Sequence, residues 1–426
     1  MVAFVSAAWV ISSDRRRFPW RIVIGGLLLQ LLLAFLVLRT AAGRWVFARI
    51  GEGFTAVMSN VEVGSGFLFN AGGENPLGES LLGTFAFGVL PTVIFFSSLM
   101  SVLYYLGIMQ RLVWAMAWVM RFTLGTTGPE TLAAAANVFV GHTEAPLVVR
   151  PYLQGMSRSE LCAMMTGGFA TVTGGLLGAY AGMGINIAHL LTASVISAPA
   201  ALLIAKVMVP EAPQGDHKDD DTGTTSEQSI NDDEIDDRVL LSTSTEHTNV
   251  IGAAVEGASE GMKLALNVGA MLIAFLALLA LIDAILGGVC QFFEWTNEQG
   301  DPSLTLGVIL GYACWPVAWL LGIPADECLV AGRLIGLKTV ANEFVAFQQL
   351  GEIRASASPE ISERTSSVLT YALAGFSNFA AIGIQVGGIG GLAPDRKADL
   401  ASLGLRAMFG GLLACCITGA VAGLML

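Results

Sequence analysis

Long apolar segments separated by short polar ones make up most of this 426-residue chain. A helix needs about 20 apolar residues to cross the hydrocarbon core of a bilayer. Residues 1–11 are apolar but too short to cross. The pattern predicts spanning helices at 22–38, 81–108 (kinked at Pro91), 161–180, 187–209, 261–286, 367–391 and 401–426.

Two further apolar segments contain helix-breaking or ionisable residues near their middle. The first carries Gly141 and Pro146, and the second carries Glu343. Glycine and proline interrupt helices, so the half-segments that remain are too short to span. We therefore expect two re-entrant helical hairpins, at 128–154 and 324–354, whose backbone is buried in protein or lines a wet cavity.

The two hairpins resemble each other and lie about 205 residues apart. The first contains the stretch 136–146 and the second contains 341–347, and both stretches begin with Ala-Asn. Each is followed by a Gly-containing segment with a polar break, at 168–173 and 375–380. Matching interruptions in two halves of a membrane protein point to a transport site. The predicted fold is an all-α polytopic membrane protein, an inverted repeat with two re-entrant hairpins and two broken transmembrane helices.

Three other segments are not expected to span. Residues 43–80 are polar and Gly-rich, which favours an external loop. Residues 111–122 are amphipathic, with Trp114 and Trp118 between flanking arginines, which favours a helix lying in the membrane interface. The segment 304–321 is either a short span or, by symmetry with 111–122, an interfacial helix.

Composition agrees with a polytopic membrane protein. The chain is 54% hydrophobic and 13% charged, and its mean hydropathy is +0.67. The net charge of −12 is concentrated in 211–249, where twelve acidic residues oppose Lys218 and Arg238, a local charge of −10. Such a polar, acidic segment predicts a disordered linker and gives no footprint for binding nucleic acid.

Lysine and arginine residues fall on one side of this layout, which predicts that this side is cytoplasmic. The termini then lie outside, and the acidic linker lies in the cytoplasm. The chain divides into N-terminal helices and an external loop that form a scaffold (1–80), a first repeat (81–210), the linker (211–249) and a second repeat (250–426).

Glu144 and Glu343 carry the sharpest chemical signal. Ionised carboxylates at bilayer depth are costly, and they mark ion or substrate pathways. The structural alternative is a cap at the positive end of a half-helix. His142 offers one donor and one acceptor for a substrate or a proton, unless a backbone carbonyl at the hairpin tip holds it.

Neutral oxygen donors suggest a second kind of site. Asn137 and Thr171, with backbone carbonyls freed at the helix breaks, could surround Na⁺; alternatively, the Thr171 hydroxyl bonds back to its own helix. Asn378 could bind a sugar or base or join two helices, and Phe376 could stack on a flat ring or simply pack. The histidines lack the spacing of metal ligands, and no hydrolytic constellation is visible.

At these residues the chain resembles the concentrative nucleoside transporter family in its bacterial eight-helix form. The similarity covers nearly the whole length and is most specific at 141–147, 264–271 and 336–344. It implies a homotrimer in the inner membrane lipid bilayer, in which each protomer imports nucleosides. Uptake in the family is driven by Na⁺, or by H⁺ in some members, and needs no organic cofactor.

The resemblance also implies residue roles. The base would contact His142, Thr143 and Glu144, with Phe376 beside it. The ribose would contact Glu343 and Asn378. Na⁺ would bind Asn137 and Thr171 and the backbone carbonyls of Val140 and Val172.

Three positions depart from the family pattern. His142 stands where Gln is usual, and it divides donor and acceptor across a ring. Ala381 replaces a serine that contacts ribose, so a hydroxyl contact is lost. Thr171 replaces serine but keeps its hydroxyl. These changes predict a shifted base or sugar preference with Na⁺ coupling retained.

The preferred hypothesis is a cation-coupled importer, since the gradient of the cation would power uptake. Two alternatives remain open: a non-transporting nucleoside receptor that signals through the acidic linker, and a membrane-embedded hydrolase using Glu144 and Glu343.

Overall fold

The computed structural model describes residues 1–69, 84–142, 144–211, 249–295 and 303–426, and these contain helices and no strands. Five helical segments of this described part are long and apolar enough to cross a membrane. This confirms the all-helical, membrane-protein fold class. The predicted linker, apart from its end residues 211 and 249, lies outside the described residues. The five segments are Trp20–Arg39, Ala86–Tyr105, Ile187–Met208, Val250–Phe292 and Pro394–Met425.

The N-terminal region is helical further than the sequence predicted. Helices α1 (Val2–Val10) and α2 (Trp20–Ala34), with its π-helical continuation Phe35–Arg39, are followed by α3 (Ala41–Leu68). The external loop predicted for 43–80 is therefore wrong for 43–68; residues 70–83 lie outside the described part. Glycine costs a helix about 1 kcal/mol per residue, so it weakens a helix without excluding one. Most of α3 is exposed, but some of its side chains pack inward: the Phe54 ring centroid lies 4.3 Å from that of Phe96, and Met58 lies against Gly178.

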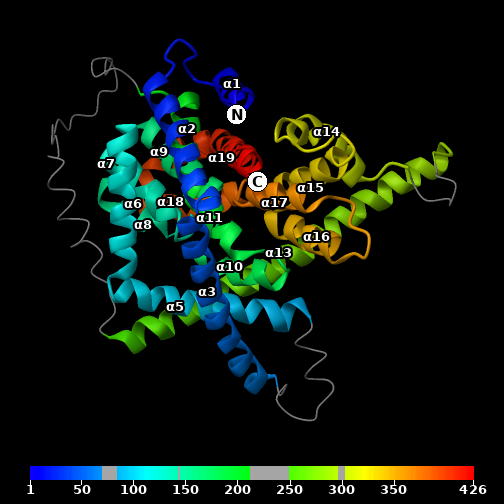
Figure 1. The fold of residues 1–426 in the computed structure, drawn as a ribbon, viewed down its shortest axis with the longest axis horizontal. Coiled ribbons are helices and arrows are strands. Elements are labelled where there is room, and N and C mark those ends of the chain that lie inside the picture. Colours follow the sequence, from blue (N-terminus) through cyan, green and yellow to red (C-terminus); the bar gives the residue numbers. More distant parts are fainter. Residues whose placement is uncertain (70–83, 143, 212–248, 296–302) are drawn as a thin grey trace.

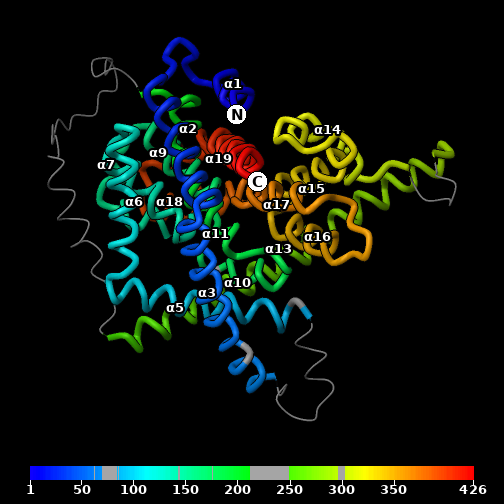
Figure 2. Tube along the Cα trace, viewed as in Figure 1, coloured from blue at the N-terminus to red at the C-terminus, as the bar shows by residue number. Residues whose placement is uncertain are grey.

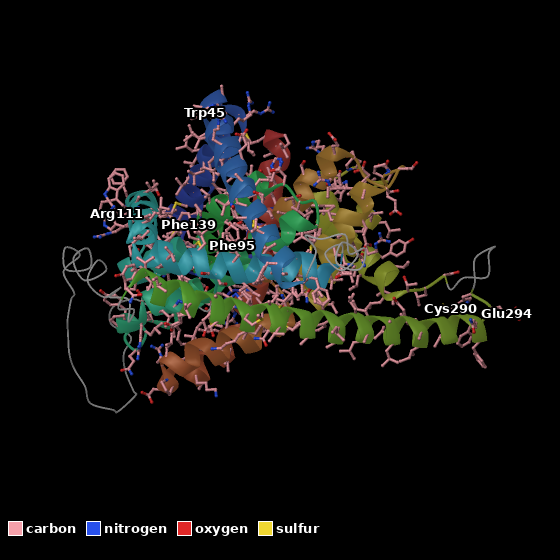
Figure 3. All side chains as sticks on the ribbon, turned by 90° about the horizontal axis from the view of Figure 1, so that it is seen from below. Trp45, Phe95, Arg111, Phe139, Cys290 and Glu294 are labelled. Carbon is pink, nitrogen blue, oxygen red and sulfur yellow. The ribbon has the colours of Figure 1, made fainter. Side chains whose placement is uncertain are left out.

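Helices α5 (Leu90–Tyr105) and α13 (Val250–Phe292) lie along each other (Figure 3). Gly257 and Gly261 permit this close approach, since a Cβ atom on either would clash with α5 backbone or side-chain atoms at 2.6–3.0 Å. The Ser98 hydroxyl also donates to the Ala254 carbonyl at 2.8 Å. Helix α13 extends well beyond the predicted span 261–286, and most of it is exposed in the protomer. Its far end projects from the molecule near Cys290 (Figure 3).

Pro91, where a kink is predicted, lies near the junction of two helical forms. A π-helical segment, Phe85–Val89, precedes α5, and Pro91 lies in the first turn of α5. Proline is tolerated there because the N–H that it lacks would have no partner in the first turn.

Two long helices form the centre of the protomer. Helices α11 (Ile187–Met208) and α19 (Lys397–Met425) are mostly buried and contact each other (Figure 1). Helix α2 packs on α11, while α9 and α17 pack on α19. The short 3-10 turn Pro394–Arg396 leads into α19. The interrupted segments pack around this core: α7 contacts α9 and α11, and α16 contacts α17.

Lys206, near the end of α11, is a buried ion-pair residue. Its ammonium lies 2.6 Å from Glu130 and 2.7 Å from Glu211, and it also donates to the Ser159 hydroxyl. A buried ammonium needs such partners because the loss of hydration is costly. The pair ties the start of the first interrupted segment to α11.

The first interrupted segment follows α6 (Ile108–Leu124). It consists of α7 (Gly128–Asn137), an irregular stretch, α8 (Ala145–Val148) and a 3-10 turn at Arg150–Tyr152. Gly141 lies in the irregular stretch, as predicted. Pro146 does not break the segment; it lies in the first turn of α8.

The second interrupted segment is more regular. Helix α14 (Leu306–Leu320) packs on α15 (Cys328–Val340), and α16 (Glu343–Ala355) follows after two residues (Figure 2). Asn342 caps α16, because its side-chain oxygen accepts from the Val345 N–H at 3.0 Å. The interfacial positions expected for α6 and α14 stay predictions.

Both predicted helix interruptions are present. Helix α9 (Arg158–Ala170) is separated from α10 (Gly174–Gly182), and α17 (Glu363–Leu373) is separated from α18 (Phe379–Leu392). The two breaks contact each other, because the Ser377 hydroxyl in the second donates to the Phe169 carbonyl at 2.8 Å at the end of α9. Backbone groups freed at one break are thus satisfied partly by the other.

Candidate functional site

Glu343 begins α16 and is buried, with 3% of its surface exposed. One carboxylate oxygen accepts from the Tyr180 hydroxyl at 3.2 Å, and the other accepts from the Asn378 side-chain amide at 3.1 Å. An ionised carboxylate offers about four acceptor positions. Each oxygen therefore keeps a lone pair for another donor, and three helical elements fix the direction in which it is offered.

Asn378 is held as firmly as its partner. It caps α18, where its side-chain oxygen accepts from the Ala381 N–H at 2.9 Å while its amide nitrogen donates to Glu343. These two bonds define the orientation of the amide. Ala381 is buried beside it and carries no hydroxyl, as the sequence shows.

The two interrupted regions of the chain meet at His142 and Phe376. Their ring centroids are 4.7 Å apart with an interplanar angle of 58°. Both ring nitrogens of His142 are buried, and neither has a hydrogen-bond partner among the residues that the structure describes. A buried donor or acceptor without a partner costs about 1–3 kcal/mol, so a polar ligand at this position would recover that cost.

Glu144 differs from Glu343 in its environment. The residue as a whole is exposed, and one carboxylate oxygen accepts from the Gly141 N–H at 2.5 Å in a partly buried hydrogen bond. Glu144 is the N-cap residue of α8, but its side chain makes no capping bond to that helix, so the structural alternative of a capping carboxylate is not found for it. The other predicted residue of this tip, Thr143, lies outside the described residues.

The residues predicted to hold Na⁺ are buried around the end of α7. Asn137 is the last residue of α7, and its amide nitrogen donates to the Met164 carbonyl at 3.4 Å. Its side-chain oxygen has no partner in the described part of the chain. Val140 and Val172 are also buried. A buried amide oxygen without a donor is suited to a hard cation.

Thr171 lies at the start of the break after α9 and is buried. Its hydroxyl donates to the Gly167 carbonyl of its own helix at 2.9 Å, which is the arrangement stated above as the alternative. The hydroxyl oxygen still has lone pairs when it donates. The hydrogen bond therefore orients the Thr171 hydroxyl oxygen and still leaves it able to bind Na⁺.

Three buried polar residues near the site were missed by the sequence analysis. Tyr180, expected only as the end of a span, bonds Glu343. Gln385 donates to the Met165 carbonyl at 3.3 Å, and its side-chain oxygen has no partner among the described residues. Lys338 is fully buried near the end of α15. The available signal was a polar residue within an otherwise apolar stretch.

A helical membrane protein with broken helices and unpartnered polar groups at their junction has the features of a transport protein. Family models agree. Residues 189–423 match the Na⁺ dependent nucleoside transporter C-terminus, residues 1–71 match its N-terminus, and residues 86–186 match a nucleoside recognition domain. The chain belongs to the family of Na⁺-dependent nucleoside transporters. This confirms the resemblance, and the family consists of transporters rather than enzymes, so the hydrolase hypothesis is rejected.

Curated relatives give the same result. An uncharacterized transporter of Haemophilus influenzae is 40% identical over 100% of this chain and 96% of its own length. Solute carrier family 28 member 3 of Eptatretus stoutii is 39% identical over 100% of this chain and 59% of its own length. Sodium/nucleoside cotransporter 1 of Mus musculus is 39% identical over 97% and 61%, respectively. The chain thus spans about three fifths of these two animal relatives.

Solved structures match over the whole chain. CNTnw in an inward-facing substrate-bound state has a TM-score of 0.87 and 39% identity, covering 100% of this chain and 96% of that one. A CNTnw variant in an outward-facing state also has a TM-score of 0.87, with 38% identity and coverage of 100% and 95%.

Proposed function

We propose that this protein is a secondary active symporter that imports nucleosides together with Na⁺ across the inner membrane. One observation carries the proposal: the Glu343 carboxylate is buried and fixed by Tyr180 and Asn378, and it retains acceptor capacity. A membrane protein gains little stability from such a group, since an ionised side chain at depth is costly. Its retention is explained by a polar ligand that donates hydrogen bonds to it.

The two regions of the site offer different chemistry to a nucleoside. Glu343 and Asn378 would bind the ribose, because vicinal hydroxyls are donors that match the two carboxylate oxygens. Phe376 and His142 would contact the base by stacking and by the free ring nitrogens, with Thr143 and Glu144 beside them. Ala381 corresponds to the family serine that contacts ribose, and because alanine has no hydroxyl it would not make this contact.

Na⁺ would bind at the end of α7. The ligands would be the unpartnered Asn137 oxygen, the Thr171 hydroxyl and the carbonyls of Val140 and Val172. Neutral oxygens and unwound backbone are the usual ligands of coupling Na⁺ in transporters. Occupancy would fix the first interrupted segment, which carries His142, and thereby favour nucleoside binding. By linkage, nucleoside would raise Na⁺ affinity by the same factor.

The architecture behind this function is also proposed. The two interrupted segments would be re-entrant hairpins, at 128–154 and 324–354, of an inverted repeat formed by 81–210 and 250–426. Together with the broken helices they would move against a scaffold that includes 1–80, and three protomers would assemble in the lipid bilayer. The termini would lie outside and the acidic linker 211–249 inside. The matching breaks and the 43-residue, largely exposed α13 support this arrangement.

Uptake by proteoliposomes tests the function. The purified protein is reconstituted, and entry of radiolabelled uridine and adenosine is measured under an inward Na⁺ gradient, under an inward H⁺ gradient and in choline. We expect accumulation that depends on Na⁺. Accumulation driven only by an H⁺ gradient would show that the coupling ion is H⁺ rather than Na⁺. Binding without flux under either gradient would favour a receptor and refute the transporter.

A further inference from the structure

A buried amide of α18 belongs neither to the sugar contacts nor to the ion site proposed above. Gln385 has only 1% of its surface exposed. Its side-chain nitrogen donates to the Met165 carbonyl of α9 at 3.3 Å. Its side-chain oxygen has no partner among the residues that the structure describes. A buried acceptor without a donor is costly, and a ligand that donates to this oxygen would recover that cost.

The bond to α9 determines which end of the Gln385 amide is free. A carbonyl oxygen can only accept, so the amide nitrogen has to face the Met165 carbonyl. Turning the amide over would lose this bond and place two oxygens against each other. Gln385 therefore presents a fixed acceptor, whereas a freely rotating glutamine could present either a donor or an acceptor.

A glycine of α9 brings this amide close to His142. A Cβ atom on Gly168 would lie 2.7 Å from the Gln385 side-chain nitrogen and 2.7 Å from the Cβ atom of His142. Both side chains thus pack against the same point of α9. The ring nitrogens of His142 also lack partners in the described part of the chain. The first interrupted segment and α18 therefore bring three unpartnered polar atoms to the region around Gly168.

Gln385 also shares a face of α18 with the proposed sugar contacts. Asn378 caps this helix, and Ala381 and Gln385 are both buried. Spacings of three and four residues place side chains on one face of a helix. Gln385 lies one turn, about 6 Å, beyond Ala381 along the helix. With the ribose at Asn378, the edge of the base that points away from the sugar is the part that would reach Gln385.

Together, Gln385 and His142 match one kind of base edge. A neutral imidazole has one N–H donor and one acceptor nitrogen. Adenine and cytosine carry an exocyclic amine, which donates, beside a ring nitrogen, which accepts. The amine would donate to the Gln385 oxygen, and the ring nitrogen would accept from the His142 N–H. Bases with a carbonyl in place of the amine would direct an oxygen at the Gln385 oxygen, which is repulsive.

We infer that Gln385 is a specificity-determining residue that selects nucleosides with an exocyclic amino group over those with a carbonyl at the same position. The preferred substrates are then adenosine over inosine and cytidine over uridine. This inference rests on the proposed function, and it concerns the base alone.

The first test varies the nucleoside and keeps the protein unchanged. Adenosine, purine riboside and inosine carry an amine, a hydrogen atom and a carbonyl, respectively, at the same ring position. Each competes, unlabelled, against Na⁺-driven uptake of tritiated adenosine in proteoliposomes. Purine riboside should need about 3- to 10-fold higher concentration than adenosine for half-inhibition, since one hydrogen bond is lost, and inosine should need more still. Purine riboside equal to adenosine, or inosine equal to purine riboside, would overturn the inference.

The second test assigns the selection to Gln385. In Gln385→Met, a side chain of similar length has no amide, so adenosine and inosine should compete about equally. This ratio is measured within one variant and does not depend on how much protein is folded. If the variant does not transport, the ratio is read from competition for equilibrium binding of tritiated adenosine to the purified protein.

A matched control is available on α13. Gln291→Met replaces an exposed glutamine near the end of this helix and should keep the wild-type ratio. A wild-type ratio in Gln385→Met would show that another residue selects the base, and it would overturn the inference. Absence of Na⁺-driven uptake of every nucleoside by wild type would reject the proposed function instead.

Discussion

The two halves of this protein share a pattern but differ in how their polar groups are satisfied. Around α7 and the break after α9, several buried atoms have no partner among the residues that the structure describes: the Asn137 oxygen, the Thr173 hydroxyl and both nitrogens of His142. Around α16 and the break after α17, Glu343 is held by Tyr180 and Asn378. The Gln385 oxygen of α18 has no partner among the described residues, so the contrast is between the unpartnered tip of the first half and the fixed carboxylate of the second.

Under the proposed function, this difference would give the two halves separate tasks. Unpartnered groups are costly in the absence of a ligand and gain most when an ion or a base arrives. A preorganised carboxylate loses little freedom on binding and fixes where the sugar lies. The first half is therefore suited to sense the ion and the base, and the second half to hold the ribose. The following variants test that division.

The largest effect is expected for Glu343→Gln. The change removes charge-assisted contacts to the sugar, each worth about 1.5–3 kcal/mol, so uptake efficiency should fall at least about 100-fold. Initial rates of uridine uptake in proteoliposomes measure it. Glu352→Gln, an exposed change on the same helix, is the control and should transport normally. Normal uptake by Glu343→Gln would contradict the role of the second half.

A smaller and more selective effect is expected for Asn137→Ala. Loss of one oxygen ligand should raise the Na⁺ concentration for half-maximal uptake roughly 10-fold, since contacts to charged groups are worth about 1.5–3 kcal/mol. The Na⁺ titration is made at saturating uridine. Asn60→Ala, which removes an exposed amide on α3, should leave the titration unchanged. An equal loss at every Na⁺ concentration would assign Asn137 to folding instead.

Tyr180→Phe tests whether the Glu343 carboxylate of the second half is preorganised by its hydrogen bond to Tyr180. The hydroxyl positions one oxygen of Glu343 and is not itself placed against the substrate, so its loss should raise KM about 3- to 10-fold with little change in kcat. Tyr312→Phe, on the exposed surface of α14, is the matched control. A fall in kcat with unchanged KM would indicate a role in the conformational step.

The smallest effects are expected at His142 and Ala381, two of the three positions at which the sequence analysis expects a departure from the family pattern. His142→Gln should change the preference between bases, and Ala381→Ser should favour nucleosides with the full set of ribose hydroxyls. Each change should amount to about 2- to 10-fold, the value of one neutral hydrogen bond. Competition of unlabelled nucleosides against uridine uptake measures both. Unchanged selectivity in both variants would remove these positions from the recognition set.

The comparison also shows where sequence reasoning succeeded. The interruptions at Gly141, at 171–173 and at 374–378 were predictable, because glycine, proline and clustered polar residues break an apolar helix locally. The loop predicted for 43–80 was wrong for 43–68, since glycine and polar residues weaken a helix without excluding one. Helix α13 extends beyond the predicted span 261–286 at both ends, to Val250 and Phe292.

By itself, the sequence determined that this chain is a helical membrane protein with two related interrupted regions, because hydropathy and helix breaking depend on neighbouring residues. It also marked Glu343, Asn378 and Asn137, since a polar residue in an apolar segment is visible locally. Only the tertiary structure decided which of these groups are satisfied. Tyr180 lies 163 residues before the carboxylate that it bonds, and Lys338 meets a carbonyl 34 residues away. Partners so distant in sequence are set by how the helices pack, which no local pattern contains.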